Sequence, residues 1–272
     1  NWMATHFSVK DNPGRGHSYV GYYLYTLERV CAFSGRKHIG AHDWYAEGAE
    51  HLVNSQAANG SWGAGGQFGF NRGDLDTIIN RLFLGKASSR ILMQKLEYGP
   101  GWNTDYFDTE DLTRRASHDL DLKCTWQTVR LEDTVEGWLE APILYITGHG
   151  KLAFTEPERA KGRELCERGG TVVADACCGN ETFDKSFREE MALIFPTVPL
   201  AEIPEGHPVY QVPHKIAVKS HMVWEGITTG CRTTVFYSKR DLSCLWDGNT
   251  HGHAGPGQVD EAAAMRLGVN VC

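Results

Sequence analysis

Two adjacent cysteines are the residues of this sequence best suited to chemistry. Cys177 and Cys178 follow a short apolar run, Thr171–Ala176, and His149 follows another such run, Pro142–Thr147. A cysteine on a strand-to-helix turn near a helix N-terminus can have a lowered pKa and act as a nucleophile, with a histidine as its base. Packing of both side chains in a crowded turn is one alternative. A soft-metal or redox role for the vicinal pair is the other.

Polar residues and glycines around this pair are candidates for holding a ligand. Asp175 ends an apolar run and could bind a ligand hydroxyl or a metal, or accept N–H bonds from its own loop. Asp184 and Arg188 are spaced i, i+4 on a helical pattern, which permits an ion pair. His207 precedes Pro208 in an extended segment. The candidate catalytic residues are therefore Cys177, Cys178 and His149, and the candidate ligand-binding residues are Gly148, Gly150, Asp175, Gly179, Asp184, Arg188 and His207.

No cofactor and no metal site are assigned from the sequence. It contains no Gly-x-Gly-x-x-Gly motif after a strand, no Walker A motif, no Gly-x-Ser-x-Gly and no His-Glu-x-x-His. It also lacks Cys-x-x-Cys, which argues against a zinc ribbon or a thioredoxin-type site. These absences disfavour nucleotide cofactors, serine hydrolysis and zincin chemistry.

A β-α-β-α series must position the candidate residues. The two apolar runs are separated by a capping-box pattern, Thr155 to Glu158, which predicts the start of a helix. A second helix follows the cysteines, with Phe183, Phe187, Met191 and Ile194 on one face, and ends at Pro196. Such alternation predicts parallel strands with right-handed crossovers. Because ligands bind at the carboxyl ends of parallel strands, the candidate residues after the two strands should share one edge.

The flanking segments extend the same pattern. The predicted strands are 91–98, 124–131, 226–238 and 242–247, and the predicted helices are 112–120, 134–140 and 259–267. Cys231 and Cys244 fall on the last two strand patterns and could approach each other, although sequence cannot settle a disulfide. The prediction is an α/β fold, a three-layer α/β/α domain with a mostly parallel sheet, over residues 89–272.

The first part of the chain, residues 1–88, is predicted to be all-helical. Apolar residues recur at helical spacing in 18–33, after Asp43, and in 75–83. Three short helices cannot bury all of these faces alone, and such helical units stack in arrays. We therefore expect a terminal repeat whose partners are upstream helical repeats of the same polypeptide, in a sequence that is part of a longer protein.

Residues 17–86 resemble a terminal repeat of the prenyltransferase and squalene-cyclase α/α toroids. The resemblance rests on Gln56-Ala-Ala-Asn-Gly60-Ser-Trp62, on Tyr22-Tyr-Leu-Tyr25 and on His42-Asp-Trp-Tyr45. In this motif the Gln can bond backbone groups at a helix end, the Gly permits the turn and the Trp covers the next unit. The acidic Asp-x-Asp-Asp motif of these cyclases is not completed by Asp74-Leu-Asp76-Thr77, so a scaffold role is expected.

The second part resembles domain-of-unknown-function family 4159. The matching motifs are Pro142-Ile-Leu-Tyr-Ile-Thr-Gly148-His149-Gly150, Glu167-Arg-Gly-Gly170, Asp175, Phe183-Asp184, Phe187-Arg188, Phe195-Pro196 and His207-Pro208. The resemblance implies a flavodoxin-like fold similar to class I glutamine amidotransferase domains. Their Gly-x-Cys-x-Gly elbow is incomplete in Ala176-Cys-Cys-Gly-Asn180, and their His-x-Glu pair is absent.

Composition limits the partners. Lys+Arg 27 against Asp+Glu 34 gives a net charge of −7, which offers no basic field for nucleic acid. Hydrophobic residues at 41% and charged residues at 22% indicate a globular chain. No apolar stretch approaches the ~20 residues of a membrane helix. The compartment stays open between cytoplasm and periplasm.

Two functional hypotheses follow. In the first, the α/β domain is a non-catalytic ligand-binding or assembly module that docks on a helical array and holds a small-molecule ligand at the carboxyl edge of its sheet. In the second, it is a cysteine-dependent hydrolase or transferase that uses Cys177 or Cys178 with His149. The sequence does not decide whether the protein is an enzyme. We favour the first hypothesis because the amidotransferase pattern is broken in several places.

Overall fold

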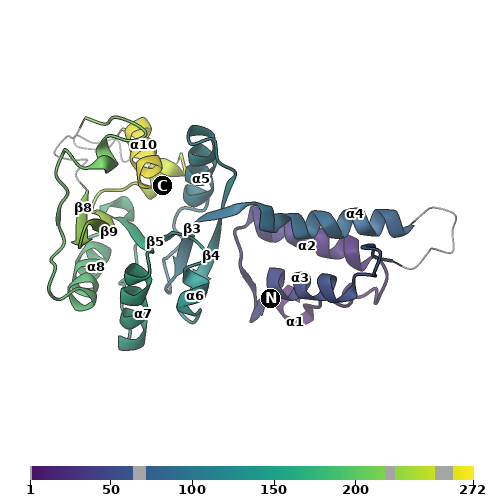
Figure 1. Ribbon diagram of the computed structural model, residues 1–272. Coiled ribbons are helices and arrows are strands. Elements are labelled where there is room, and N and C mark those ends of the chain that lie inside the picture. The colour runs from purple at the N-terminus through teal and green to yellow at the C-terminus, as the bar shows by residue number, and fades with distance from the viewer. Residues whose placement is uncertain (1, 64–71, 218–223, 249–259) are drawn as a thin grey trace. The chain divides into compact units, whose positions relative to one another are not determined.

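The computed structural model describes residues 2–63, 72–217, 224–248 and 260–272. Two compact units make up the chain, Asn1–Ser89 and Arg90–Cys272 (Figure 1). Each unit has its own hydrophobic core, so each is described by itself.

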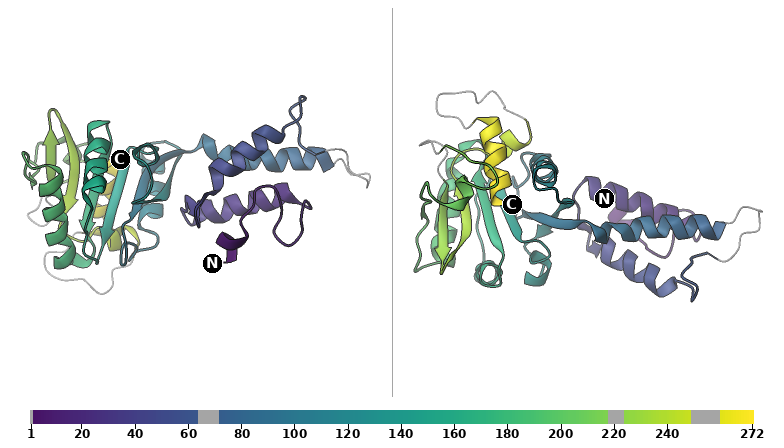
Figure 2. Two further views of the ribbon diagram at one scale, coloured as in Figure 1. Left: turned by 90° about the horizontal axis from the view of Figure 1, so that it is seen from below. Right: turned by 45° about the horizontal axis from the view of Figure 1, so that its top comes forward.

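The first unit is helical, and three of its helices surround one core (purple to blue in Figure 2). Its elements are α1 (Trp2–His6), α2 (Val20–Phe33), β1 (His38–Ile39), β2 (His42–Asp43), α3 (Trp44–Ser55), α4 (Arg72–Leu84) and the 3-10 helix η1 (Gly85–Ser88). Helix α3 begins as predicted, because the carboxylate of Asp43 accepts a 2.9 Å hydrogen bond from the backbone N–H of Ala46. Leu24, Leu27 and Phe83 are buried where α2 and α4 meet the rest of the core.

The Gln-to-Trp motif works differently from its sequence-based interpretation. The Gln56 amide donates to the carbonyl of Gly60 at 2.9 Å, so it closes the loop and not the helix end. It is the indole N–H of Trp62 that donates to the carbonyl of Leu52, in the last turn of α3, at 2.7 Å. The Trp62 ring is buried in the core of its own unit. The motif therefore ties one helix end to its following loop within a single unit.

The second unit is built on a seven-stranded sheet. Its strands are β3 (Arg90–Glu97), β4 (Cys124–Arg130), β5 (Ile143–Gly148), β6 (Thr171–Ala176), β7 (Ala201–Glu202), β8 (Glu225–Thr229) and β9 (Arg232–Ser238). They lie in the order β4-β3-β5-β6-β9-β8-β7. The first five are mutually parallel, whereas β8 and β7 are antiparallel to their neighbours. The mixed α/β fold with a mostly parallel sheet is as predicted.

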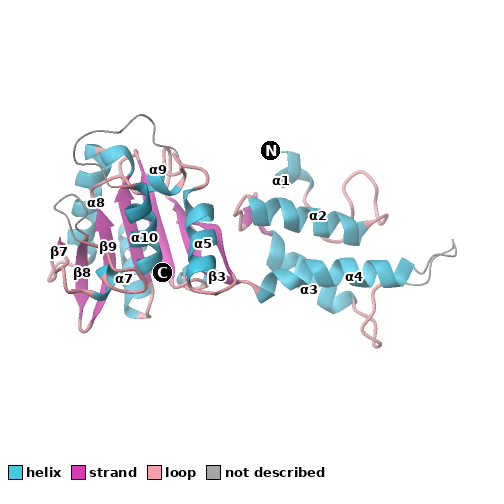
Figure 3. Cartoon of the chain, turned by 90° about the horizontal axis from the view of Figure 1, so that it is seen from above, coloured by secondary structure: helices cyan, strands magenta, loops and turns pink. Residues whose placement is uncertain are grey.

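Helices cover both faces of this sheet (Figures 1 and 3). They are α5 (Asp108–Asp119), α6 (Val135–Trp138), α7 (Glu156–Glu167), α8 (Glu181–Ile194), α9 (Ser243–Trp246) and α10 (Glu261–Val271), with 3-10 helices η2 (Cys177–Gly179) and η3 (Pro208–Tyr210). One apolar core joins α5, α9 and α10 to one face, and the other joins α6, α7 and α8 to the opposite face. This arrangement is compatible with three layers. The predicted face of α8, from Phe183 to Ile194, is buried.

Two late predictions need correction. The predicted strand 226–238 is a hairpin of two strands, β8 and β9, with Cys231 exposed at its turn. The predicted strand 242–247 is wrong, because residues Ser243–Trp246 form the short helix α9. Cys231 and Cys244 therefore lie beyond opposite ends of β9 and do not meet. The final helix, predicted from Val259, which lies outside the described residues, is α10.

Within the described residues, no helix combines the length and the apolar character needed to span a membrane.

Candidate functional site

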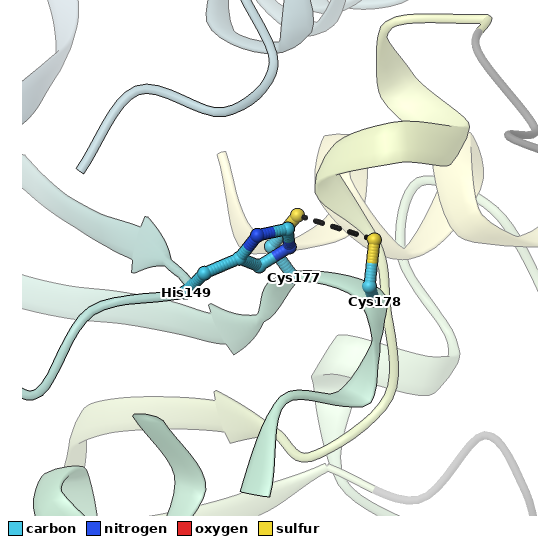
Figure 4. A group of neighbouring side chains, drawn as sticks. All are labelled: His149, Cys177 and Cys178. Atoms are coloured by element: carbon cyan, nitrogen blue, oxygen red, sulfur yellow. Dashed lines mark hydrogen bonds between the residues drawn. The ribbon is translucent and has the colours of Figure 1, made fainter. Parts of the chain in front are cut away.

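His149 and Cys177 lie side by side because of the sheet register. Gly148 at the end of β5 pairs with Ala176 at the end of β6, so the next residue of each strand emerges at the same level. Figure 4 shows His149 and the cysteine pair gathered at this edge. The parallel-strand rule thus explains why these predicted residues come together.

The loop after β3 closes over the two glycines at the end of β5. The carbonyl of Gly101 accepts a 3.1 Å hydrogen bond from the backbone N–H of His149. Gly148 has φ +144°, and a Cβ there would lie 2.2 Å from the Gly101 carbonyl oxygen; a Cβ on Gly150 would lie 2.4 Å from the Pro100 carbonyl oxygen. These two glycines, predicted as ligand contacts, therefore allow the loop to approach the sheet edge.

The cysteine turn has an unusual backbone. Cys178 has φ 54° and ψ 19°, in the left-handed region, and Gly179 follows with φ +64°. A left-handed conformation costs a residue with a side chain roughly 1–2 kcal/mol. Asn180 then caps α8, since its side chain accepts hydrogen bonds from the N–H groups of Thr182 and Phe183.

A third cysteine completes the site. The Sγ atom of Cys244, on α9, lies 3.7 Å from the Sγ atoms of both Cys177 and Cys178, which are 3.8 Å apart. Cys177 and Cys244 are each only 1% exposed. The thiol of Cys177 donates to Asp105 Oδ2 at 3.1 Å and accepts from the Thr104 hydroxyl at 3.1 Å. Three separate segments therefore bring polar groups to one triangle of sulfurs.

Asp175 fixes the segment that carries Cys244. Its Oδ2 accepts hydrogen bonds from the backbone N–H groups of Leu242 and Ser243 at 2.9 and 3.0 Å, and its Oδ1 accepts from the Tyr145 hydroxyl at 2.7 Å. These donors come from other elements and not from the aspartate's own loop. Burial, followed by the neighbouring charge of Asp241, raises the pKa of Asp175 to about 7. Asp175 thus lies beneath the site as a buried anchor.

The imidazole of His149 is exposed beside the sulfurs. A ring nitrogen of His149 and the Sγ atoms of Cys177 and Cys178 all lie within 4.8 Å of one another. The same limit holds for a carboxylate oxygen of Asp241 with the sulfurs of Cys178 and Cys244. Among the described residues, no hydrogen bond joins the His149 ring to a thiol.

The surroundings keep the thiols of Cys178 and Cys244 protonated. Burial, and then the neighbouring Cys177, raises the pKa of Cys178 to about 12. The hydrogen-bonded Cys177, and then burial, raises the pKa of Cys244 far above its usual range.

The Tyr98 hydroxyl is buried at this edge with no hydrogen-bond partner in the described part of the chain, and burial raises its pKa as well.

The remaining candidates lie apart from the sulfurs. The predicted Asp184–Arg188 ion pair is present, with Nε 2.8 Å from the carboxylate. Arg188 also binds both carboxylate oxygens of Glu225 at 2.6 Å, and Tyr237 donates to Asp184 at 2.7 Å, so the pair joins α8 to β8 and β9. His207 accepts from the Val209 N–H and contacts Thr233, near the start of β9. His207 is thus at the opposite edge of the parallel strands.

A buried ion pair under the site was not predicted. Lys95, 1% exposed on β3, places Nζ 2.7 Å from Asp108 Oδ2 and 2.8 Å from both Asn103 Oδ1 and the Asp105 carbonyl. It therefore holds the loop that presents Thr104 and Asp105 to Cys177. The available signal was a lysine inside an apolar strand pattern, which requires a buried partner.

Fold and site together define an α/β protein with a mostly parallel sheet and a cysteine-lined site at the carboxyl edge. Residues 93–272, about two thirds of the chain, match the family described as Domain of unknown function (DUF4159), and the chain belongs to this family. The resemblance of the second part of the sequence to this family is thereby confirmed. None of the curated proteins matches this chain.

Proposed function

We propose that the α/β unit is a ligand-binding module that performs no covalent chemistry of its own. Its five parallel strands, taken in chain order, lie 2-1-3-4-5 across the sheet, as in flavodoxin-like folds. In such folds the ligand binds where the strand order reverses, which here is between β3 and β5. Gly148 ends β5 at that point and His149 follows it, opposite the loop after β3.

The hydrogen bonding of Cys177 is the observation that supports binding over catalysis. A cysteine nucleophile requires a base within hydrogen-bond reach of its thiol. The Cys177 thiol donates to Asp105, and its other sulfur contacts are Cys178 and Cys244. The exposed His149 ring makes no hydrogen bond to any of the three within the described residues. The alternative, a hydrolase or transferase resembling class I glutamine amidotransferases, would use His149 as its base, and within the described residues His149 makes no hydrogen bond to a thiol in this geometry.

We assign the helical unit to assembly. On α4, Leu75, Ile78 and Leu82 follow helical spacing and are 56%, 57% and 49% exposed. A helix normally buries such a stripe against a neighbour. The spacing and exposure of this stripe support packing against further helical repeats, as in the toroid arrays that this unit resembles. The α/β unit would dock on such an array.

Thiol labelling tests the absence of catalysis. We expect iodoacetamide to label the exposed Cys231 rapidly in the native chain, whereas Cys177 and Cys178 react only as the protein unfolds. Mass spectrometry of the labelled peptides gives each rate, and Cys231 serves as the internal control. Amide and ester substrates should show no turnover. Rapid labelling of Cys177 or Cys178 that falls in His149→Ala, together with turnover, would show that the protein is an enzyme.

A further inference from the structure

We propose that Cys177, Cys178 and Cys244 hold one thiophilic divalent metal ion, best matched by Zn²⁺, with His149 as the fourth ligand. This inference rests on the proposed function and names the ligand class of the same site. It develops the soft-metal alternative that the vicinal pair left open. The sequence alone offered only two of the three cysteines, because Cys244 was predicted to lie on a strand.

The sulfur triangle has the dimensions of one face of a zinc-thiolate tetrahedron. A Zn–S bond of about 2.3 Å implies a sulfur–sulfur edge of about 3.8 Å in a regular tetrahedron. The three measured edges are 3.7, 3.7 and 3.8 Å. Three thiols in simple van der Waals contact would have similar spacing, so the sulfur–sulfur distances alone do not distinguish a metal site from packed thiols.

The backbone of Cys178 supplies the first additional observation. Its left-handed conformation, φ 54°, aims a side chain from a strained turn at the other two sulfurs. Strained residues of this kind persist where the surroundings hold them, and they gather at ligand sites. Two cysteines with nothing to bind could pack without this strain. A metal–sulfur bond accounts for the conformation, because it offsets the backbone cost.

The hydrogen-bonding groups around the sulfur triangle supply the second additional observation. The hydroxyl of Thr104 lies 3.1 Å from Cys177 Sγ and 3.3 Å from Asp105 Oδ2, and a hydrogen bond to the sulfur would suit a thiolate acceptor. The carboxylate of Asp105 accepts a hydrogen bond from the same sulfur at 3.1 Å. Overall, one M²⁺ would displace three thiol protons to solvent as three M–S bonds form, which leaves the cluster with one negative charge.

His149 is the candidate for the fourth position, because a ring nitrogen lies within 4.8 Å of the sulfurs of Cys177 and Cys178. Three cysteines and one histidine form an established zinc ligand set. The ring of His149 is exposed and can rotate, whereas its backbone is fixed by the Gly101 carbonyl. A neutral imidazole adds no charge to a cluster already flanked by Asp105 and Asp241. His149 therefore closes the site on its solvent side.

Cobalt titration of the 272-residue chain tests the site. The protein is purified under reducing conditions, stripped with a chelator and titrated with Co²⁺, whose tetrahedral thiolate complexes have intense charge-transfer bands. We expect one Co²⁺ per chain, displaced by Zn²⁺. Cys244→Ser should weaken Co²⁺ binding more than about 100-fold, and His149→Ala about 10-fold or more. Cys166→Ser is the matched control, because Cys166 is also buried but contacts Thr234 and not the triangle.

The outcomes separate this inference from the proposed function. Absence of Co²⁺ binding with all three thiols reduced, or binding unchanged in Cys244→Ser, would overturn the metal site and leave a non-catalytic module in place. Cysteine-dependent turnover by the stripped protein would instead overturn the proposed function. If Cys244→Ser does not fold, the wild-type protein provides the test of the metal site. Zn²⁺ should then raise the Tm of the reduced wild-type protein, and an unchanged Tm would contradict the site.

Discussion

Asp175 is the single residue on which the site most depends. It is fully buried and accepts three hydrogen bonds, one from Tyr145 in the sheet and two from the backbone just before Cys244. A buried donor that loses its acceptor costs about 1–3 kcal/mol, and here three donors share one carboxyl group. Asp175 therefore determines where α9, and with it Cys244, lies.

Substitution of Asp175 should show this dependence. We expect Asp175→Ala to lower the free energy of unfolding by about 3 kcal/mol or more, because three buried donors lose their acceptor. Asp175→Asn keeps the shape and one acceptor oxygen, so it should cost markedly less. Urea denaturation of both variants measures the difference. Equal losses in the two variants would contradict the role of the hydrogen bonds.

At the scale of single residues, the sequence predicts the site residues that directly follow regular strands and misses the other residues of the site. His149, Cys177 and Cys178 could be placed together because parallel strands end at a common edge. Cys244 could not, because the short apolar pattern of 242–247 also fits a strand. Its four-residue helix is imposed by tertiary hydrogen bonds to Asp175, and Asp241 adds one to the N–H of Cys244.

Among the elements, α5 is held at its C-terminal end by a charge cluster. Asp119 accepts from Arg115 at 2.7 Å, from His118 at 2.9 Å and from His214, in the segment after η3, at 2.8 Å. The Arg115 hydrogen bond, followed by that of His118, holds the pKa of Asp119 well below its usual range. One carboxylate thus joins α5 to a distant part of the chain.

The lowered pKa predicts a pH dependence of stability. A carboxyl whose pKa is lower in the folded state stabilises the fold above the unfolded-state pKa of about 3.9, and this contribution disappears as the pH falls below that value. Asp119→Asn should therefore lower the urea midpoint at pH 7, and the difference from wild type should shrink towards pH 2. Asp121→Asn, at an exposed position nearby, is the control and should change little.

A difference in urea midpoint between Asp119→Asn and wild type that stays constant across that pH range would contradict the ionic origin of the stabilisation.

Helix faces and caps, such as Phe183 to Ile194 and Asp43, were predictable because they are local. The contact of Asp119 with His214 was not, because those residues are 95 positions apart in the chain.

At the scale of the whole molecule, the chain combines two units, and the helical unit leaves part of an apolar helix face exposed. The helical unit buries Phe83 completely, whereas Ile78, five positions earlier on the same helix, is 57% exposed. The sequence predicted both residues on one helical face, because periodicity identifies an apolar stripe but not the partner that covers it. The exposed part of that stripe supports the proposed packing against further repeats.

This difference between Phe83 and Ile78 is measurable in the 272-residue chain. We expect Phe83→Ala to destabilise the helical unit by about 3–5 kcal/mol, through loss of core packing. Ile78→Ser should change the stability by less than about 0.5 kcal/mol, as at other exposed positions. Calorimetry of the two unfolding transitions gives both values. A large loss in Ile78→Ser would show that the chain itself already covers this face.

The most direct test of the metal site is X-ray absorption at the zinc edge on the zinc-loaded 272-residue chain. The account predicts a first shell of three sulfurs at about 2.3 Å and one nitrogen at about 2.0 Å, with one sulfur lost in Cys244→Ser. A first shell made only of nitrogen and oxygen, or one unchanged by that substitution, would contradict the proposal that the three cysteines bind the ligand of this domain.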